Sequence, residues 1–185
     1  DLADVIHDVT FKLIHRHPHV FGSIQADTVD QVLKNWDEIK KEEKNQQSYT
    51  DTLRAVPKTF PALMRAQKVQ KRAGKVGFDF ENQQQTWDAL AEEIQELKEA
   101  VTQQDPSAME EELGDVLFSV VNLSRLLGLD AEKCLTNAVE KFINRFAKVE
   151  FLAEQQQLDL KRPAHETLEP LYQQTKCHLS DKSTD

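Results

Sequence analysis

Apolar residues recur along most of the chain at spacings of three and four, which is the pattern of amphipathic helices rather than strands. Glycine occurs five times and proline six times in 185 residues, so few positions interrupt such helices. The periodicity therefore predicts an all-α protein. The expected helices span residues 2–17, 28–44, 60–73, 86–103, 107–127, 131–155 and 167–177.

Residues with defined roles at helix ends mark several of these boundaries. Asp105 and the proline after it begin the fifth helix, where Ser107 and Glu110 have the spacing of a capping box. Asp130 is placed to cap the sixth helix. The joins between residues 86 and 155 are short, so neighbouring helices are expected to pack antiparallel, as in a helical bundle.

The two central helices differ in how their apolar residues are distributed. The helix over 86–103 carries a stripe expected to be buried, formed by Trp87, Leu90, Ile94, Leu97 and Val101. The next helix is apolar nearly all round from residue 113 to 127, which predicts a central, buried helix. Its polar side chains follow a single line at spacings of three, seven and ten: Glu112, Asp115, Ser119 and Asn122.

Acidic side chains gather around this line. Glu93 and Glu96 lie one turn apart on the preceding helix, with Cβ atoms about 5–6 Å apart. Opposite Glu112 and Asp115 of an antiparallel neighbour, they would make four carboxylates, and residues 81–115 contain one base, Lys98, to neutralise them. Burying an unpaired carboxylate costs several kcal/mol. An all-oxygen ligand set suits Mg²⁺ or Mn²⁺, and a metal-free polar seam is the alternative.

Basic residues occur where they can hold phosphate. Residues 52–78 contain seven Lys and Arg and no acid, whereas residues 81–115 contain eleven acids and one base. Such adjacent blocks of opposite charge suit a cation and an anion bound together. Lys141, Arg145 and Lys148 share one face of the sixth helix, either as a solvated face or as a phosphate clamp. Lys68 and Arg72, one turn apart, are candidates for the same role.

Several function classes are excluded by composition. The formal charge of −9 argues against a general binder of nucleic acid polymers, and Asp115, Asn122 and Arg125 interrupt the most apolar stretch, so no membrane span is expected. Two cysteines are too few for a disulfide scaffold, which favours a reducing compartment, the cytoplasm. No histidine has a glutamate three positions before it, as di-iron bundles require. The group His15, His17 and His19 is interpreted as an ordinary chain turn.

The acidic pattern resembles a known signature. Glu92-Glu93-Ile94-Gln95-Glu96 and, after fifteen intervening residues, Glu112-Leu113-Gly114-Asp115 are similar to the Glu-Glu-x2-Glu and Glu-x2-Asp motifs of the MazG family of nucleoside triphosphate pyrophosphohydrolases. Residues 75–80, 110–118, 121–123 and 140–146 also resemble the C-terminal domain of two-domain bacterial members. Residues 16–21 resemble the end of their N-terminal domain, and residues 36–40 resemble their linker.

This resemblance implies an activity and a set of residues. It implies Mg²⁺-dependent hydrolysis of nucleoside triphosphates or deoxynucleoside triphosphates between the α and β phosphates, giving a monophosphate and pyrophosphate. The implied metal ligands are Glu93, Glu96, Glu112 and Asp115, and Glu92 and Glu96 are the candidates for activating water. Substrate contacts are expected at Lys68, Arg72, Asn122, Lys141, Arg145, Tyr172 and Lys176, with Tyr172 standing where the family has tryptophan.

The organisation of the chain follows from the same comparison. Residues 12–17 match residues 141–146 with the same Lys and Arg spacing, as if the chain began in the last helix of an earlier copy. We expect that helix over 1–22, a linker with a helix over 23–59, the catalytic domain over 60–178 and a disordered tail over 179–185. A homodimer is expected, because the apolar helix after residue 113 needs a further layer to cover it. The alternative function is a non-catalytic dimerisation or partner-binding module with a structural acidic seam.

Overall fold

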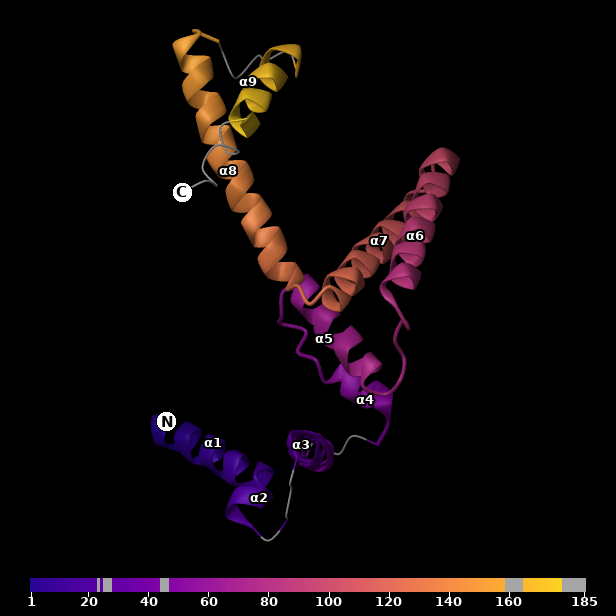
Figure 1. Ribbon diagram of the computed structural model, residues 1–185, viewed down its shortest axis with the longest axis vertical. Coiled ribbons are helices and arrows are strands. Elements are labelled where there is room, and N and C mark those ends of the chain that lie inside the picture. The colour runs from indigo at the N-terminus through magenta and orange to yellow at the C-terminus, as the bar shows by residue number, and fades with distance from the viewer. Residues whose placement is uncertain (23, 25–27, 44–46, 159–164, 178–185) are drawn as a thin grey trace. The chain divides into compact units, whose positions relative to one another are not determined.

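The computed structural model describes residues 1–22, 24, 28–43, 47–158 and 165–177. In these ranges all regular structure is helical, which confirms the predicted all-α class (Figure 1). The helices are α1 (Leu2–Arg16), α2 (Pro18–Phe21), α3 (Val29–Glu43), α4 (Tyr49–Arg54), α5 (Ala62–Gly74), α6 (Gln83–Gln103), α7 (Pro106–Leu126), α8 (Ala131–Gln155) and α9 (His165–Cys177). The tail expected over 179–185 and residues 159–164 of the α8–α9 connection lie outside the described residues.

Most predicted boundaries agree with the structure to within three residues, and α8 has the predicted bounds. Two short helices, α2 and α4, were missed. A capping pair begins α4: the amide of Asp51 donates to Ser48 Oγ at 3.1 Å, and the amide of Ser48 donates to Asp51 Oδ2 at 2.9 Å. This reciprocal pair is a capping box that starts a helix.

The cap of α7 is Asp105 rather than the predicted Ser107. Asp105 Oδ1 accepts from the amides of Ser107 and Ala108 at 3.0 and 3.2 Å. Proline has no N–H to satisfy and occupies the first helical position, so the cap falls on the residue before it. The prediction for α8 is confirmed, because Asp130 Oδ1 accepts from the amide of Lys133 at 2.9 Å.

The chain divides into two compact units, and the first comprises residues 1–60 and 68–80. Here Arg16 and Glu43 join α1 to α3 through a hydrogen bond of 3.0 Å between Nε and Oε2. The Arg16 guanidinium also lies 5.7 Å from the ring centre of Trp36. The histidine group is a chain turn, as predicted, because α1 ends at Arg16 and α2 begins at Pro18.

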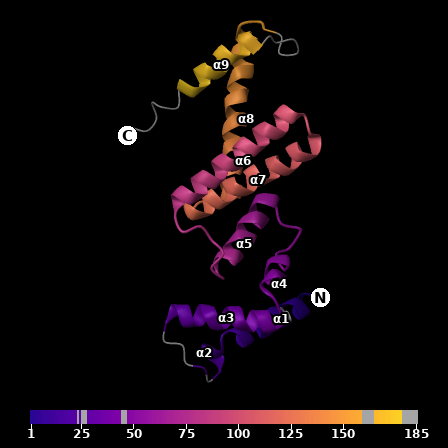
Figure 2. The same cartoon turned by 90° about the vertical axis from the view of Figure 1, so that its right-hand side faces the viewer.

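The second unit comprises residues 61–67 and 81–185. Helices α6 and α7 lie side by side and antiparallel in both views (Figures 1 and 2). Helices α8 and α9 pack through a small core of Val149, Ala153 and Leu171. The start of α8 is tied to α5 by Gln67, whose Nε2 donates to the Leu129 carbonyl at 2.8 Å and whose Oε1 accepts from the Ala131 amide at 3.1 Å.

The buried faces of α6 and α7 differ from the prediction. The buried residues of α6 are Thr86, Leu90 and Ala100, so the helix is turned relative to the expected stripe, and Trp87, Ile94 and Val101 are exposed. On α7 only Val121 and Leu123 are fully buried among the described residues, and Leu113 and Leu117 remain about half exposed. The expected burial of this helix is therefore wrong for the single chain. Across the described residues, no helix combines the length and apolarity that a membrane crossing needs.

Candidate active site

The tight turn between α6 and α7 sets the two helices in register. Gln104 ends α6 in the left-handed conformation with φ of 55°, and Asp105 caps α7, so two residues reverse the chain. Glu96 lies eight residues before Gln104, and Glu112 lies seven residues after Asp105. At a rise of about 1.5 Å per residue, these two glutamates reach nearly the same level of the hairpin.

The same counting pairs the other two acids. Glu93 lies eleven residues before Gln104, and Asp115 lies ten residues after Asp105. The two counts differ by one residue, so Glu93 and Asp115 are separated along the hairpin axis by only about 1.5 Å. The four acids thus form two levels, one turn apart.

Three of the four expected ligands meet in the structure. Carboxylate oxygens of Glu93, Glu96 and Glu112 all lie within 4.8 Å of one another. Glu93 and Glu112 are half-buried between the helices, whereas Glu96 is exposed. Within the described residues, this is the one group of three or more His, Cys, Asp or Glu side chains close enough to hold a metal ion. Its donors are all carboxylate oxygens, which fit a hard divalent cation such as Mg²⁺ or Mn²⁺.

Asp115 stands beside this group without belonging to it. Burial raises the pKa of Glu93 above its usual range, and the negative charge of Asp115 is the next largest cause. The charges of Glu96, Glu112 and Glu92 raise the Glu93 pKa further, in that order. Asp115 and Glu92 are both exposed.

Glu112 experiences the same environment from the other helix. Burial raises its pKa, followed by the charges of Glu96, Glu111 and Asp115. Because like charges and partial burial both disfavour ionised carboxylates, the cluster is under electrostatic strain at neutral pH without a counter-charge. No Lys or Arg of the described residues forms an ion pair with these acids. A divalent cation would therefore supply the missing positive charge.

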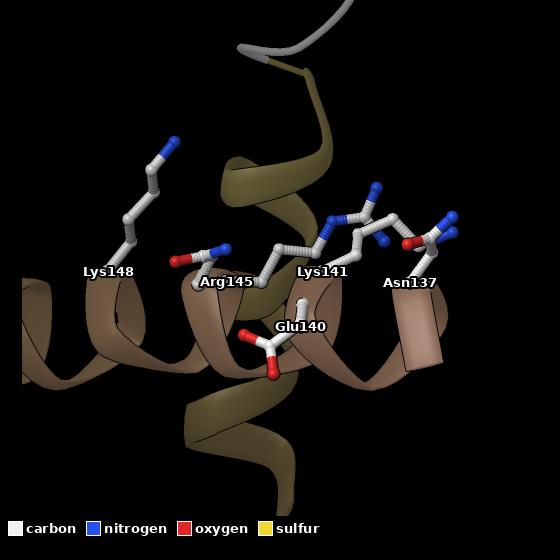
Figure 3. A pocket seen from close by; sticks show the side chains of 6 residues that line it. Asn137, Glu140, Lys141, Arg145 and Lys148 are labelled. Atoms are coloured by element: carbon white, nitrogen blue, oxygen red, sulfur yellow. The ribbon is translucent and has the colours of Figure 1, made fainter. Parts of the chain in front are cut away.

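The basic residues of α8 form a second group. An open hollow on this helix is lined by Asn137, Glu140, Lys141, Asn144, Arg145 and Lys148. Figure 3 shows Lys141, Arg145 and Lys148 projecting from one side of the helix, away from Glu140. Arg145 Nε is buried and has no hydrogen-bond partner in the described part of the chain. A guanidinium with an unused buried donor is suited to an anionic ligand.

The C-terminal helix adds an aromatic side chain next to the basic helix. The half-buried Tyr172 of α9 has its ring centre 6.1 Å from that of Phe142 on α8, with the ring planes at 46°. Lys176 belongs to α9, but its side chain lies outside the described residues. Tyr172 is thus on the helix pair that carries Lys141 and Arg145.

The remaining expected contact residues have other partners in the structure. Lys68 and Arg72 belong to the first unit, where Lys68 Nζ lies 5.6 Å from the Phe60 ring centre and Arg72 donates to the Thr52 carbonyl. Asn122 is half-buried on α7, and its Oδ1 accepts from Arg125 Nε at 3.1 Å and Nη2 at 2.6 Å. Arg125 was not among the expected site residues, although its position three residues after Asn122 was a usable signal.

Comparison with known proteins adds relatives over nearly the whole chain. The family described as the MazG nucleotide pyrophosphohydrolase domain matches residues 81–150. A nucleoside triphosphate pyrophosphohydrolase of Escherichia coli K12 is 42% identical over 180 residues, covering 95% of this chain and 68% of that protein.

Two further relatives have similar coverage of this chain. A nucleoside triphosphate pyrophosphohydrolase/pyrophosphatase MazG of Thermotoga maritima is 40% identical over 175 residues, covering 95% of this chain and 66% of that protein. The uncharacterized protein YabN of Bacillus subtilis is 38% identical over 176 residues, covering 95% of this chain and 36% of that protein. Each of these three matches covers 95% of this chain.

Proposed function

Because this chain belongs to the MazG nucleotide pyrophosphohydrolase family, we propose that it hydrolyses nucleoside triphosphates, ribo- or deoxyribo-, between the α and β phosphates. The products are a nucleoside monophosphate and pyrophosphate. The observation that carries this proposal is the convergence of Glu93, Glu96 and Glu112 within 4.8 Å, with no nitrogen or sulfur ligand in the group.

Magnesium is the proposed cofactor, and manganese is a substitute with the same ligand preference. Glu93, Glu96, Glu112 and Asp115 would hold it from the two levels of the hairpin. The cation supplies charge neutralisation of the triphosphate and polarisation of the phosphorus that is attacked.

The chain's own residues then have distinct tasks. Glu92 or Glu96 orients a water molecule and accepts its proton as the water oxygen bonds to phosphorus. The bond from that phosphorus to the oxygen bridging the α and β phosphates breaks, and pyrophosphate departs. Lys141 and Arg145 stabilise the developing negative charge.

The other predicted contacts hold the rest of the nucleotide. Lys68 and Arg72 would add positive charge at the phosphates, Asn122 and Tyr172 would contact the nucleoside, and Lys176 would close the site. The support for Tyr172 is its position against Phe142, on the helix pair that bears Lys141 and Arg145. The cytoplasm stays the predicted location, with no nucleic acid polymer as partner.

We also infer that the active form is a homodimer. Apolar side chains of α7 that a central helix would bury are exposed in the single chain, among them Leu113, Leu117, Phe118 and Val120. On α8 the apolar side chains Leu135, Val139, Phe142 and Ile143 are exposed as well. A second copy would cover such faces.

Pyrophosphate release from a panel of nucleoside triphosphates with Mg²⁺ tests the activity. We expect release by the unaltered chain and a loss of about 100-fold or more in Glu96→Ala and Asp115→Asn, because each removes a charge that holds the metal. Glu99→Gln is the matched control, since Glu99 is exposed on the same helix and hydrogen-bonded only to Gln95 among the described residues.

Circular dichroism must show unchanged helix content in all three variants. Pyrophosphate release that stays unchanged in both Glu96→Ala and Asp115→Asn would reject the proposal. Calorimetry with Mg²⁺ and a non-hydrolysable nucleotide gives a second measurement, because a structural acidic seam does not predict saturable, metal-dependent binding.

A further inference from the structure

Asn122 and Arg125 form a two-point contact on the last turns of α7. Both side chains are half-buried, and the guanidinium reaches the same amide oxygen through two nitrogens, Nε at 3.1 Å and Nη2 at 2.6 Å. Two donors from one guanidinium fix the position of that oxygen more tightly than one hydrogen bond does.

The chemistry of this pair permits one orientation of the amide. Arg presents donors only, so the Asn122 atom that faces it must be the carbonyl oxygen and not the NH₂ group. The reversed amide would place donor against donor. Asn122 is therefore held with its oxygen occupied and with two N–H donors directed elsewhere. In the described part of the chain, the Nδ2 group of Asn122 donates to no other residue.

The pair lies in line with the metal cluster. Glu112, Asp115, Ser119 and Asn122 follow one another along a single line of α7. Asn122 stands seven residues beyond Asp115, which is about 10 Å along the helix axis. A nucleotide whose phosphates lie at the carboxylates can extend its sugar and base along this line.

We propose that Arg125 is a positioning residue that holds the Asn122 carboxamide so that its N–H donors meet acceptor atoms of the substrate's nucleoside. The inference rests on the proposed function and narrows the ligand chemistry. Asn122 can donate a hydrogen bond to a nucleoside acceptor, such as a base carbonyl oxygen or an unprotonated ring nitrogen. It cannot do so to a donor in the same place. Purine N3 and pyrimidine O2 are acceptors common to all bases, so such a contact tolerates several bases.

Kinetics of pyrophosphate release, with Mg²⁺ and the triphosphate that the unaltered chain hydrolyses best, test this role. Asn122→Asp keeps an oxygen toward Arg125 and removes both donors, so KM should rise about tenfold with kcat within about twofold. Arg125→Lys keeps the charge and loses the fork, so KM should rise about threefold to tenfold, again with little change in kcat.

A double-mutant cycle separates positioning from a structural effect. If Arg125 acts through the amide, Arg125→Lys added to Asn122→Ala should leave KM no higher than Asn122→Ala alone. A merely structural role predicts instead a lower melting temperature in Arg125→Lys with unchanged KM. Ser124→Ala is the matched control on the same turn, because it removes the hydrogen bond from Ser124 Oγ to the Val120 carbonyl and should leave KM unchanged.

The outcomes distinguish this inference from the proposed function. Activity in the unaltered chain together with additive KM effects of the two substitutions would overturn the role of Arg125 alone. An unchanged KM in Arg125→Lys would do the same. No pyrophosphate release from any triphosphate by the unaltered chain would overturn the proposed function, and the role of Arg125 with it.

Discussion

Glu93 of α6 and Glu112 of α7 bring negative charge to half-buried positions in one cluster of carboxylates. Burial and neighbouring carboxylates raise the pKa of both groups, so each is less stable ionised here than in the unfolded chain. Without a cation the arrangement lowers stability. Side chains that oppose folding in this way are typical of functional sites.

A neutral replacement should therefore stabilise the metal-free protein. Glu93→Gln keeps the shape of the side chain and removes one of the repelling charges, so its melting temperature without metal should exceed that of the unaltered chain. The same variant should lose the increase in melting temperature that Mg²⁺ gives the unaltered chain. Thermal unfolding with EDTA and with excess Mg²⁺ measures both effects.

Glu99→Gln, outside the cluster on the same helix, is the control and should change neither quantity. A lower melting temperature of Glu93→Gln in EDTA would contradict this prediction and would favour a structural role for the cluster.

The raised pKa values also predict how stability depends on pH. Between the ordinary glutamate value of about 4.5 and the raised folded value, the native state binds more protons than the unfolded state. The contribution of these groups to the free energy of unfolding is thus greatest at low pH and is lost as pH rises through the folded pKa. Because metal binding requires deprotonated carboxylates, the Mg²⁺-induced rise in melting temperature should be larger at about pH 8 than at about pH 5.

Melting curves at the two pH values, with and without Mg²⁺, check this dependence. In the double variant Glu93→Gln with Glu112→Gln, the melting temperature without metal should fall less as pH rises. Equal stabilisation by Mg²⁺ at both pH values would show that these carboxylates do not bind it.

At the scale of elements, the α6–α7 hairpin depends on its two-residue turn. Gln104 reverses the chain in the left-handed conformation, and Asp105 satisfies two amides at the start of α7. The turn fixes which levels of the helices face each other, and so it decides that Glu96 lies opposite Glu112 and Glu93 opposite Asp115. The cap is thus part of the structure that assembles the site.

Removal of that cap should weaken the fold by a moderate amount. Asp105→Ala leaves the amides of Ser107 and Ala108 without their acceptor and should lower the free energy of unfolding by about 1 kcal/mol. Urea unfolding measures the change. Asp130→Ala removes the cap of α8 and should lower the free energy of unfolding by a similar amount. Its Mg²⁺ affinity should stay closer to that of the unaltered chain than the affinity of Asp105→Ala does. An unaltered urea midpoint in Asp105→Ala would contradict the assigned role.

The rotation of α6 illustrates what periodicity leaves undetermined. Leu90 and Leu97 were expected to face inward; Leu90 is buried and Leu97 half-buried, but Thr86 and Ala100 take inward positions in place of Trp87 and Val101. The side chains that take inward positions are small, and the large ones lie on a face that the single chain does not cover. A hydrophobic stripe gives the mean direction of burial, and neighbouring helices decide its final angle.

At the scale of the whole molecule, exposed apolar faces on α7 and α8 predict self-association. Leu113 is 49% exposed and Leu117 is 51% exposed on the same side of α7, one turn apart. Leu117→Glu places a charge in the proposed interface and should shift the chain from dimer to monomer at micromolar concentration. Analytical ultracentrifugation measures this shift.

Lys98→Glu is the control for added negative charge, because Lys98 is an exposed polar residue of α6. We expect it to sediment like the unaltered chain. A monomeric unaltered chain at these concentrations would contradict the proposed homodimer.

Residue patterns along the chain were enough to predict the all-α class, most helix boundaries and the acidic residues that meet in the site. Helical periodicity, caps and the short turn after Gln103 are local features, and local rules suffice to read them. Which faces of α6 and α7 are covered, and the two hydrogen bonds that Arg125 donates to the Asn122 oxygen, became visible only in the folded chain. These depend on the packing angle between helices and on side-chain rotamers, and residue spacing does not fix either of them.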